Sequence, residues 1–184
     1  MASTRAATRR EDEGSAAVDR WIGEMTSDGS VLSDAGLLRL TCELGAQREL
    51  WRDHVHHDPT APHDVRLHVQ PELEIWLVCW LDGQTLPLRD PVACRGCIFI
   101  AEGSLTERIV EISQTWSVPR TYTRGANTAF CFDGDRIHSI GHANDGPALS
   151  IHAHTPSRAG SHRGIFGQGR SGRAPARAGD LVVI

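Results

Sequence analysis

The sequence predicts an all-β fold, a sandwich or barrel of short strands, with one helix packed outside it. Two observations predict this fold: short apolar runs follow one another between residues 64 and 156, and turn signals separate them. Short strands at this spacing are typical of sandwiches and barrels. A stretch with helical periodicity precedes them and supplies the helix. The chain has 184 residues, which suits one domain with tails.

The helix is expected over residues 33–52. Ser33 is a suitable N-cap. Leu37, Leu40 and Leu44 recur at the spacing of one helix face. Proline disfavours a helical residue before it, so the segment around Pro59 ends the helix. We therefore expect one helix whose apolar stripe packs against the strands.

Five strands are expected from apolar content and flanking turns. The run LEIWLVCWL is apolar at nearly every position, which is typical of a central strand buried on both faces. Asp82-Gly83 and Asp133-Gly134 are turn dipeptides. The expected strands are Leu73–Leu81, Cys97–Ala101, Leu105–Ile112, Thr128–Phe132 and Pro147–His154.

The chain divides into three segments. Residues 1–30 are small, polar and charged without a sustained period, and we expect them to be disordered or variable. Residues 31–156 form the expected β domain. Residues 157–184 hold five arginines and six glycines, which predicts a flexible basic tail.

Composition and charge exclude several classes of function. A net charge of −4 gives no support for nucleic-acid binding. No apolar run reaches the about 18 residues that span a bilayer, so we expect no membrane association. No apolar segment follows the N-terminal arginines, so we expect no signal peptide and a cytoplasmic location.

The cysteines are expected to be reduced thiols. Five of them, without the spacing of a disulfide framework, are typical of a reducing compartment. Cys94 and Cys97 form a C-x-x-C pair, which elsewhere binds zinc or acts as a redox dithiol. The sequence has no second C-x-x-C pair, and this one stands at the start of a strand rather than of a helix. We therefore expect neither zinc binding nor a redox role.

A spaced motif covers residues 83–103. It reads Gly83, five residues, Arg89-Asp90-Pro91, four residues, Gly96, six residues and Gly103. This spacing resembles the first cupin motif, G-x5-H-x-H-x4-E-x6-G, with both of its glycines in place. Arg89 and Pro91 stand at the two histidine positions, and Gly96 stands at the glutamate position.

The segments around this motif narrow the resemblance. The runs EIWLVCWLDGQTLPLRD, GCIFIAEGSLTE and HSIGHANDGPALSIHAHTP resemble the cysteine dioxygenase family in their order and separation. The similarity runs from about Leu32 to Pro156. It implies a cupin double-stranded β-barrel, the jelly roll, with the N-terminal helix packed outside.

The resemblance also implies a chemistry. Enzymes of this family hold Fe(II) with three histidines and add O2 to a small thiol, cysteine or 3-mercaptopropionate, to give its sulfinate. By position, His138 matches the third iron ligand, and Arg66 matches the arginine that pairs with the substrate carboxylate. Ser150 and His152 match the first two members of a Ser-His-Tyr relay, and His154 stands in place of the tyrosine. We expect a monomer.

Two departures from the family pattern bear on the iron site. Arg89 keeps its proton and has no lone pair to donate, and Pro91 has no donor atom in its side chain. Two functions from different classes therefore remain open. One is an Fe(II)-dependent thiol dioxygenase, and the other is a non-catalytic cupin that binds a small carboxylate without metal, through Arg66 and also through Arg89.

The histidines allow a further arrangement of the site. His138 and His142 share one strand face, and His152 and His154 share another, because residues an even number apart on a strand point the same way. A metal site rebuilt from these four is one alternative. The other, which we favour, is that His152 and His154 are packed and hydrogen-bonded and that His142 is solvated at a strand end.

Overall fold

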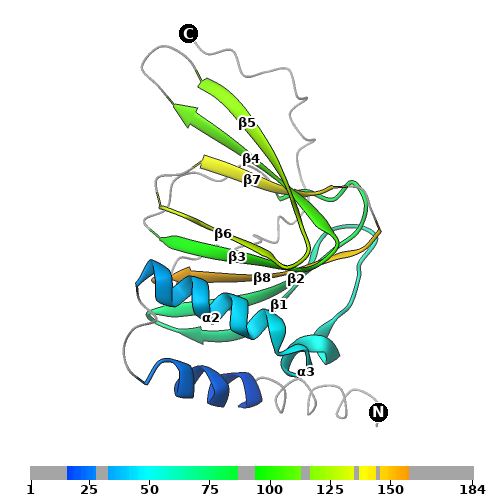
Figure 1. Ribbon diagram of the computed structural model, residues 1–184. Coiled ribbons are helices and arrows are strands. Elements are labelled where there is room, and N and C mark those ends of the chain that lie inside the picture. The colour runs from blue at the N-terminus through cyan, green and yellow to red at the C-terminus, as the bar shows by residue number, and fades with distance from the viewer. Residues whose placement is uncertain are drawn as a thin grey trace, which may run out of the picture.

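The fold consists of two facing antiparallel sheets and a helical layer on the outside of one of them (Figure 1). The computed structural model describes residues 16–27, 33–86, 94–112, 117–134, 137–143 and 146–157. The five-stranded sheet has the order β1-β2-β8-β3-β6, and the three-stranded sheet has the order β5-β4-β7. The strands are β1 His63–Gln70, β2 Leu73–Trp80, β3 Arg95–Glu102, β4 Ser104–Ile112, β5 Ser117–Gly125, β6 Thr128–Phe132, β7 Ile137–His142 and β8 Ala148–Thr155.

The helical layer is longer and more broken than expected. The expected helix over 33–52 is observed as α2 Asp34–Ala46, α3 Arg48–Trp51 and a 3-10 turn, η2 Arg52–His54. The Ser33 hydroxyl accepts from Gly36 N at 3.0 Å, as an N-cap does. Gln47 interrupts the helix with φ −84° and ψ 65°. The indole of Trp51 then donates to Leu44 O at 3.0 Å and holds the two pieces together.

A second helical segment covers residues 16–25. Its Val18 and Ile22 are fully buried and join the core between helices and sheet. The expectation of a disordered N-terminal segment is therefore wrong for these residues. Val18, Trp21, Ile22 and Met25 follow the spacing of one helix face, so the sequence carried a signal for this helix that was overlooked among the polar residues of the segment.

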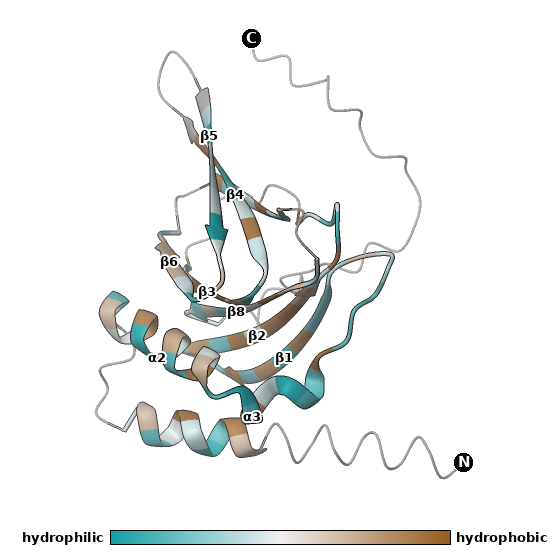
Figure 2. Ribbon diagram, turned by 45° about the vertical axis from the view of Figure 1, so that its right-hand side comes forward, coloured by the Kyte–Doolittle hydropathy of each residue, from teal (hydrophilic) through white to brown (hydrophobic). Residues whose placement is uncertain are grey.

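Two apolar cores lie on opposite faces of the five-stranded sheet. The outer core joins the leucines of α2 to Leu149, Ile151 and Ala153 of β8. The inner core lies between the two sheets and includes Val78 and Trp80 of β2. Strand β2 contributes to both, which explains its apolar run and its brown colour in Figure 2.

The architecture confirms the expected all-β jelly roll with an N-terminal helix outside it. The two sheets face each other as an open sandwich rather than a fully closed barrel. The expected strands are present, and β1, β5 and β7 add to them. The described part of residues 73–101 contains no helix.

The expectation of reduced cysteines is wrong for two of the five. Cys97 of β3 and Cys131 of β6 are directly opposite in the sheet, with Cα atoms 4.0 Å apart, and form a disulfide. Cys42, Cys79 and Cys94 are not part of a disulfide. Cys97 therefore pairs across the sheet, and not with Cys94 of the C-x-x-C pair.

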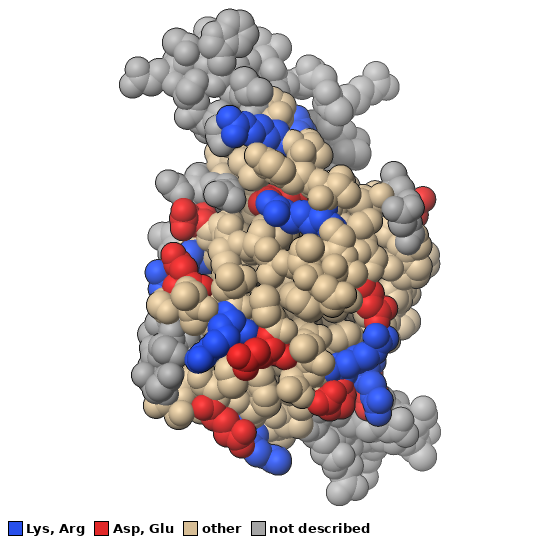
Figure 3. Space-filling view, viewed as in Figure 1, with Lys and Arg blue, Asp and Glu red and all other residues tan. Residues whose placement is uncertain are grey.

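The surface agrees with the modest net charge. Figure 3 shows acidic and basic side chains interspersed over the face that it draws. None of the helices in the described ranges has the length and apolar character that crossing a bilayer requires.

Two motif glycines adopt left-handed backbone conformations, and they should differ in how well they tolerate alanine. Gly83 has φ 74° and open space around it, whereas a Cβ at Gly103 (φ 70°) would lie 2.7 Å from Pro147 O and from Ala148 Cβ. We expect Gly83→Ala to cost about 1 kcal/mol, from backbone conformation alone. Gly103→Ala should cost about 2–4 kcal/mol because overpacking is added. Urea unfolding of both variants measures the difference, and equal losses would contradict the packing argument.

Candidate active site in the inter-sheet interior

One face of the five-stranded sheet points toward the three-stranded sheet and carries the polar residues of interest. Strand pairing places Arg66, Trp76, His152, Ile98 and Phe130 in one row across β1, β2, β8, β3 and β6. Side chains in such a row share one face of the sheet. Arg66 at the edge and His152 at the centre therefore lie on the same interior face.

A short hydrogen-bond chain runs along β2 and β8. The Trp80 indole N–H donates to Ser150 Oγ at 2.9 Å, and Ser150 Oγ lies 2.8 Å from His152 Nε2. The indole is only a donor, which leaves the Ser150 hydroxyl proton available for Nε2. The Trp80 and His152 rings stack with centroids 6.3 Å apart. All three side chains are buried, so the hydrogen bond and the packing hold the His152 ring in one orientation.

A buried carboxylate organises the facing sheet. Glu107 on β4 is 1% exposed and accepts two hydrogen bonds from the Arg124 guanidinium of β5, at 3.1 and 2.7 Å. Its other oxygen lies 3.2 Å from His138 Nδ1 on β7. Burial by itself raises the pKa of Glu107, but the hydrogen bonds from His138 and Arg124 and the charges of both outweigh burial and lower it.

The Glu107 contact also sets the state of the His138 ring. A carboxylate can only accept, so Nδ1 of His138 carries the proton and donates. In the neutral ring the lone pair is then on Nε2. On the side away from His138, the Arg124 guanidinium packs over the Phe130 ring of β6, with 4.3 Å between the guanidinium and the ring centre.

Phe132 links the two sheets between the candidate histidines. Its ring centre lies 4.4 Å from that of His138 and 5.7 Å from that of His154. Gly96 makes room for it, because a Cβ there would lie 2.4 Å from Phe132 Cζ and 3.0 Å from His154 Nδ1. The glycine at the motif's glutamate position thus allows an aromatic ring to fill the interior.

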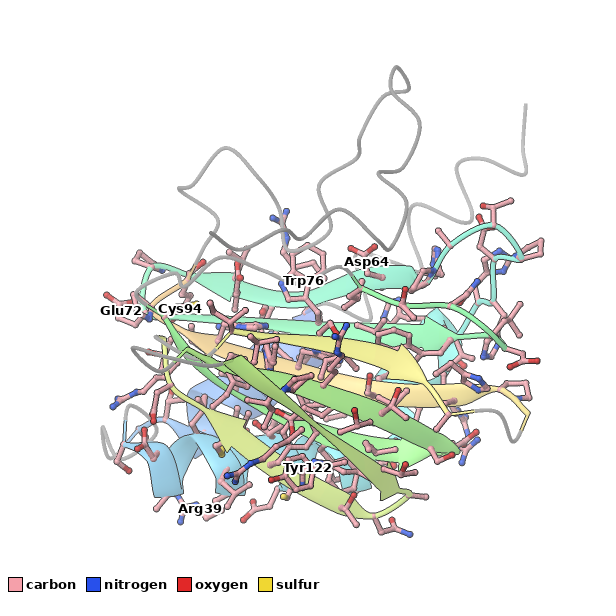
Figure 4. All side chains as sticks on the ribbon, turned by 90° about the horizontal axis from the view of Figure 1, so that it is seen from above. Arg39, Asp64, Glu72, Trp76, Cys94 and Tyr122 are labelled. Atoms are coloured by element: carbon pink, nitrogen blue, oxygen red, sulfur yellow. A yellow bond between two sulfur atoms is a disulfide. The ribbon has the colours of Figure 1, made fainter. Side chains whose placement is uncertain are left out.

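Arg66 lies at the margin of this interior. Its side chain is exposed, and its guanidinium lies 5.7 Å from the centre of the Trp76 ring. Figure 4 shows Trp76 and Asp64 projecting on the same side of β1 and β2. Within the described part of the chain, Arg66 forms no ion pair, so its charge is available to an anion.

His142 does not join the other histidines. Its ring Nε2 donates to the carbonyl oxygen of Gly146, and its Nδ1 lies 3.6 Å from Asp82 Oδ1. The expectation that it is solvated is wrong, because its side chain is buried. It helps to hold the turns after β2 and before β8 together.

Most of the predicted site residues lie together in the space between the two sheets. Ser150, His152, His154 and His138 come together there, with Arg66 at its margin. Sequence reasoning missed Glu107, Arg124 and Phe132, and it gave Trp80 no place in the site. Glu107 belongs to the E-G-S-L-T-E run, but the sequence carries no signal that pairs it with an arginine on the next strand.

The residues present do not fit an Fe(II) site of the kind that the resemblance implies. Arg89, Asp90 and Pro91 lie outside the described residues, and the side chains of Arg89 and Pro91 cannot donate to a metal. In the ranges that the structure covers, no three His, Cys, Asp or Glu side chains are grouped to hold a metal ion. His138 instead has a carboxylate on one nitrogen and an aromatic ring against its face.

Comparisons with solved structures agree with the fold. The chain is similar to TT1209 from Thermus thermophilus, with 14% identity and a TM-score of 0.50, covering 57% of this chain and 92% of that one. It is also similar to KdgF from Halomonas sp. (13%, TM-score 0.49, 59% and 91%) and to an RmlC-like cupin from Shewanella frigidimarina (12%, TM-score 0.46, 56% and 84%). At these identities the likeness to the Thermus protein shows the fold alone.

A family comparison is more specific. None of the curated proteins compared matches the chain. A model of the family described as cysteine dioxygenase type I matches residues 37–163, well over half of the sequence. That range contains the β domain, the spaced glycine motif and every candidate site residue discussed above. The chain therefore belongs to the cysteine dioxygenase type I family, with a cupin fold.

Proposed function

We propose that this protein is a non-catalytic cupin that binds a small carboxylic acid without a metal ion, and that Arg66 binds the carboxylate. The observation that carries the proposal is the position of Arg66: exposed, stacked on Trp76, on the interior face that also holds His152. A guanidinium without an ion pair presents a planar pair of donors that matches a carboxylate.

The polar groups deeper in the interior support the same function. Ser150 and His152 provide a hydroxyl and an imidazole held in one orientation, and His138 provides an acceptor nitrogen. Aromatic side chains surround them, as is typical of sites that bind small molecules. Such a set can orient a small acid without any bond being made or broken.

The test is binding of a simple acid. We expect propionate and 3-mercaptopropionate to bind the unmodified protein, and Arg66→Met to weaken both by about tenfold or more, because a charge-assisted hydrogen bond is lost. Arg108→Met is the matched control, since Arg108 is an exposed arginine of β4 outside the interior. Isothermal titration measures all three proteins. Failure of any small carboxylate to bind, or equal affinity in the Arg66 variant, would overturn the proposal.

Family membership supports a second candidate, the Fe(II)-dependent oxidation of cysteine or 3-mercaptopropionate to its sulfinate. Iron content and sulfinate formation of the purified protein separate the two candidates. The double variant Arg89→His with Pro91→His restores the two missing donors and serves as the positive control. Stoichiometric iron with sulfinate formation by the unmodified protein would favour the dioxygenase and count against a purely binding role.

A further inference from the structure

Strand β6 carries two aromatic rings that cover one side of the inter-sheet interior. It is the shortest strand of the five-stranded sheet and lies at its edge, so among the described strands it pairs with β3 alone (Figure 1). Phe130 and Phe132 are both buried in the inner core. Phe130 packs on Arg124 and Phe132 packs on His138. The two rings thus cover the polar cluster that Glu107 organises.

A disulfide attaches this edge strand to the sheet on the opposite face. Cys131 lies between Phe130 and Phe132, and consecutive side chains of a strand point to opposite faces. Its partner Cys97 belongs to the outer core, whereas the next pair along the ladder, Gly96 and Phe132, faces the interior. The covalent bond therefore fixes the backbone of β6 at the residue between its two interior rings.

The fit of Phe132 makes it sensitive to the backbone of β6. A Cβ at Gly96 would lie 2.4 Å from Phe132 Cζ, so the ring already fills the space beside β3. A strand with one neighbour opens more readily than a central strand, because fewer hydrogen bonds and buried contacts are lost when it opens. Without the disulfide, β6 is such a strand, and its opening withdraws Phe132 from His138.

The two sulfurs differ in their access to solvent. Cys97 is buried, whereas Cys131 is only partly buried. A thiolate of an external dithiol can therefore attack Sγ of Cys131, which forms a mixed disulfide and releases the Cys97 thiolate to take up a proton. The second thiolate of the dithiol then displaces Cys131. The protein disulfide gains two electrons and two protons, and the dithiol is oxidised to a disulfide.

We propose that the Cys97–Cys131 disulfide is a redox switch, and that its reduction by a dithiol frees β6, withdraws Phe132 and opens His138 to small molecules from solvent. In the disulfide form the interior is nearly closed, and the His138 side chain is 11% exposed. The switch goes beyond the proposed function and does not depend on it, because Arg66 lies on β1 at the opposite edge of the sheet.

Modification by diethyl pyrocarbonate measures the opening at His138. The reagent acylates an unprotonated imidazole nitrogen, and Nε2 of His138 has the lone pair because Nδ1 donates to Glu107. At neutral pH, dithiothreitol should raise the modification rate of His138 in the unmodified protein by about tenfold or more. His142, which is buried and bonded to the Gly146 carbonyl, is the internal control and should stay slow. An unchanged rate at His138 would overturn the proposal.

Hydrogen exchange separates local opening from a general loss of stability. Reduction should raise the ratio of amide exchange rates between β6 and the central strand β2 by about tenfold or more. Equal acceleration in both strands would show that the bond only stabilises the whole fold, and would overturn the switch. Reoxidation with oxidised glutathione should restore slow modification of His138, and a rate that stays fast in refolded, disulfide-bonded protein would also count against it.

Variants assign the effect to the bond and to the ring. The double variant Cys97→Ala with Cys131→Ala should be modified at the fast rate without dithiothreitol, and a slow rate there would overturn the role of the disulfide. Phe132→Leu should make His138 react fast while the disulfide is intact. Phe130→Leu is the matched control on the same strand, because Phe130 packs on Arg124 instead, and it should still need reduction. If Phe132→Leu needs reduction as well, the assignment to Phe132 fails.

Discussion

Replacing Glu107 by glutamine is expected to lower the free energy of unfolding by about 3 kcal/mol at neutral pH. Removing one member of a buried ion pair costs about 3–5 kcal/mol, because the remaining charge is left unpaired. The lower end applies here because the Arg124 side chain is 28% exposed and can turn toward solvent. The exposed Glu49→Gln is the control, and it should change stability by less than about 0.5 kcal/mol.

The same variant should change the response of the protein to acid. The pKa of Glu107 is lowered in the folded state, from an ordinary value of 4.5. Its contribution to stability is therefore complete above pH 4.5 and is lost as the pH falls below that value. Urea unfolding between about pH 7 and pH 3 should show the curves of the original protein and Glu107→Gln converging in acid. Parallel curves would contradict the ion-pair account.

A double-mutant cycle isolates the pair. Arg124→Met and Glu107→Gln, alone and together, should be strongly non-additive, because each single change removes the same interaction. Additive losses would show that Glu107 acts through His138 or through packing instead.

Breaking the Cys97–Cys131 disulfide is expected to cost about 3–4 kcal/mol. The bond closes a loop with a sequence separation of 34, and a loop of that size restricts the unfolded chain by roughly this amount. The variant Cys97→Ala with Cys131→Ala should show the loss in urea unfolding. Reductant should destabilise the original protein and have no effect on the double variant.

Counting thiols checks the bond itself. Alkylation of the unfolded, unreduced protein should modify three cysteines, Cys42, Cys79 and Cys94. Modification of all five would show that the pair is reduced in the purified protein, and would remove the basis of the expected stability loss.

The strands that the sequence predicts are those whose side chains are buried. The run of β2 and the run within β3 are apolar because a core lies on each side of them. Strand β5 escaped prediction because it is an exposed edge strand with Pro119, Arg120 and Arg124 in it, so burial imposes no period on its sequence. Local pattern therefore predicts elements only where packing constrains the side chains.

The candidate site was predictable in a similar, partial way. Family position gave His138, Ser150 and His152, and the structure brings them to one interior. Family position did not predict the ion pair between Glu107 and Arg124. That pair depends on how β4 and β5 are aligned, which no local sequence pattern specifies. Family position also did not predict that the Phe132 ring fills the interior, because this depends on the space that Gly96 leaves.

The irregularity in β1 has a consequence for how the two sides of the sheet are connected. The register shifts between Arg66 and His68, so Arg66 is opposite Trp76 while His68 is opposite Ile75. Leu67 and His68 are therefore consecutive residues on the helical side, where His68 bonds Asp19 at 2.6 Å. One extra residue changes the phase of the strand, as a β-bulge does. A regular ladder of the same residues would place Leu67 opposite Ile75 and His68 opposite Glu74. His68 would then point inward, and its bond to the helix at residues 16–25 would be lost from the strand that carries Arg66.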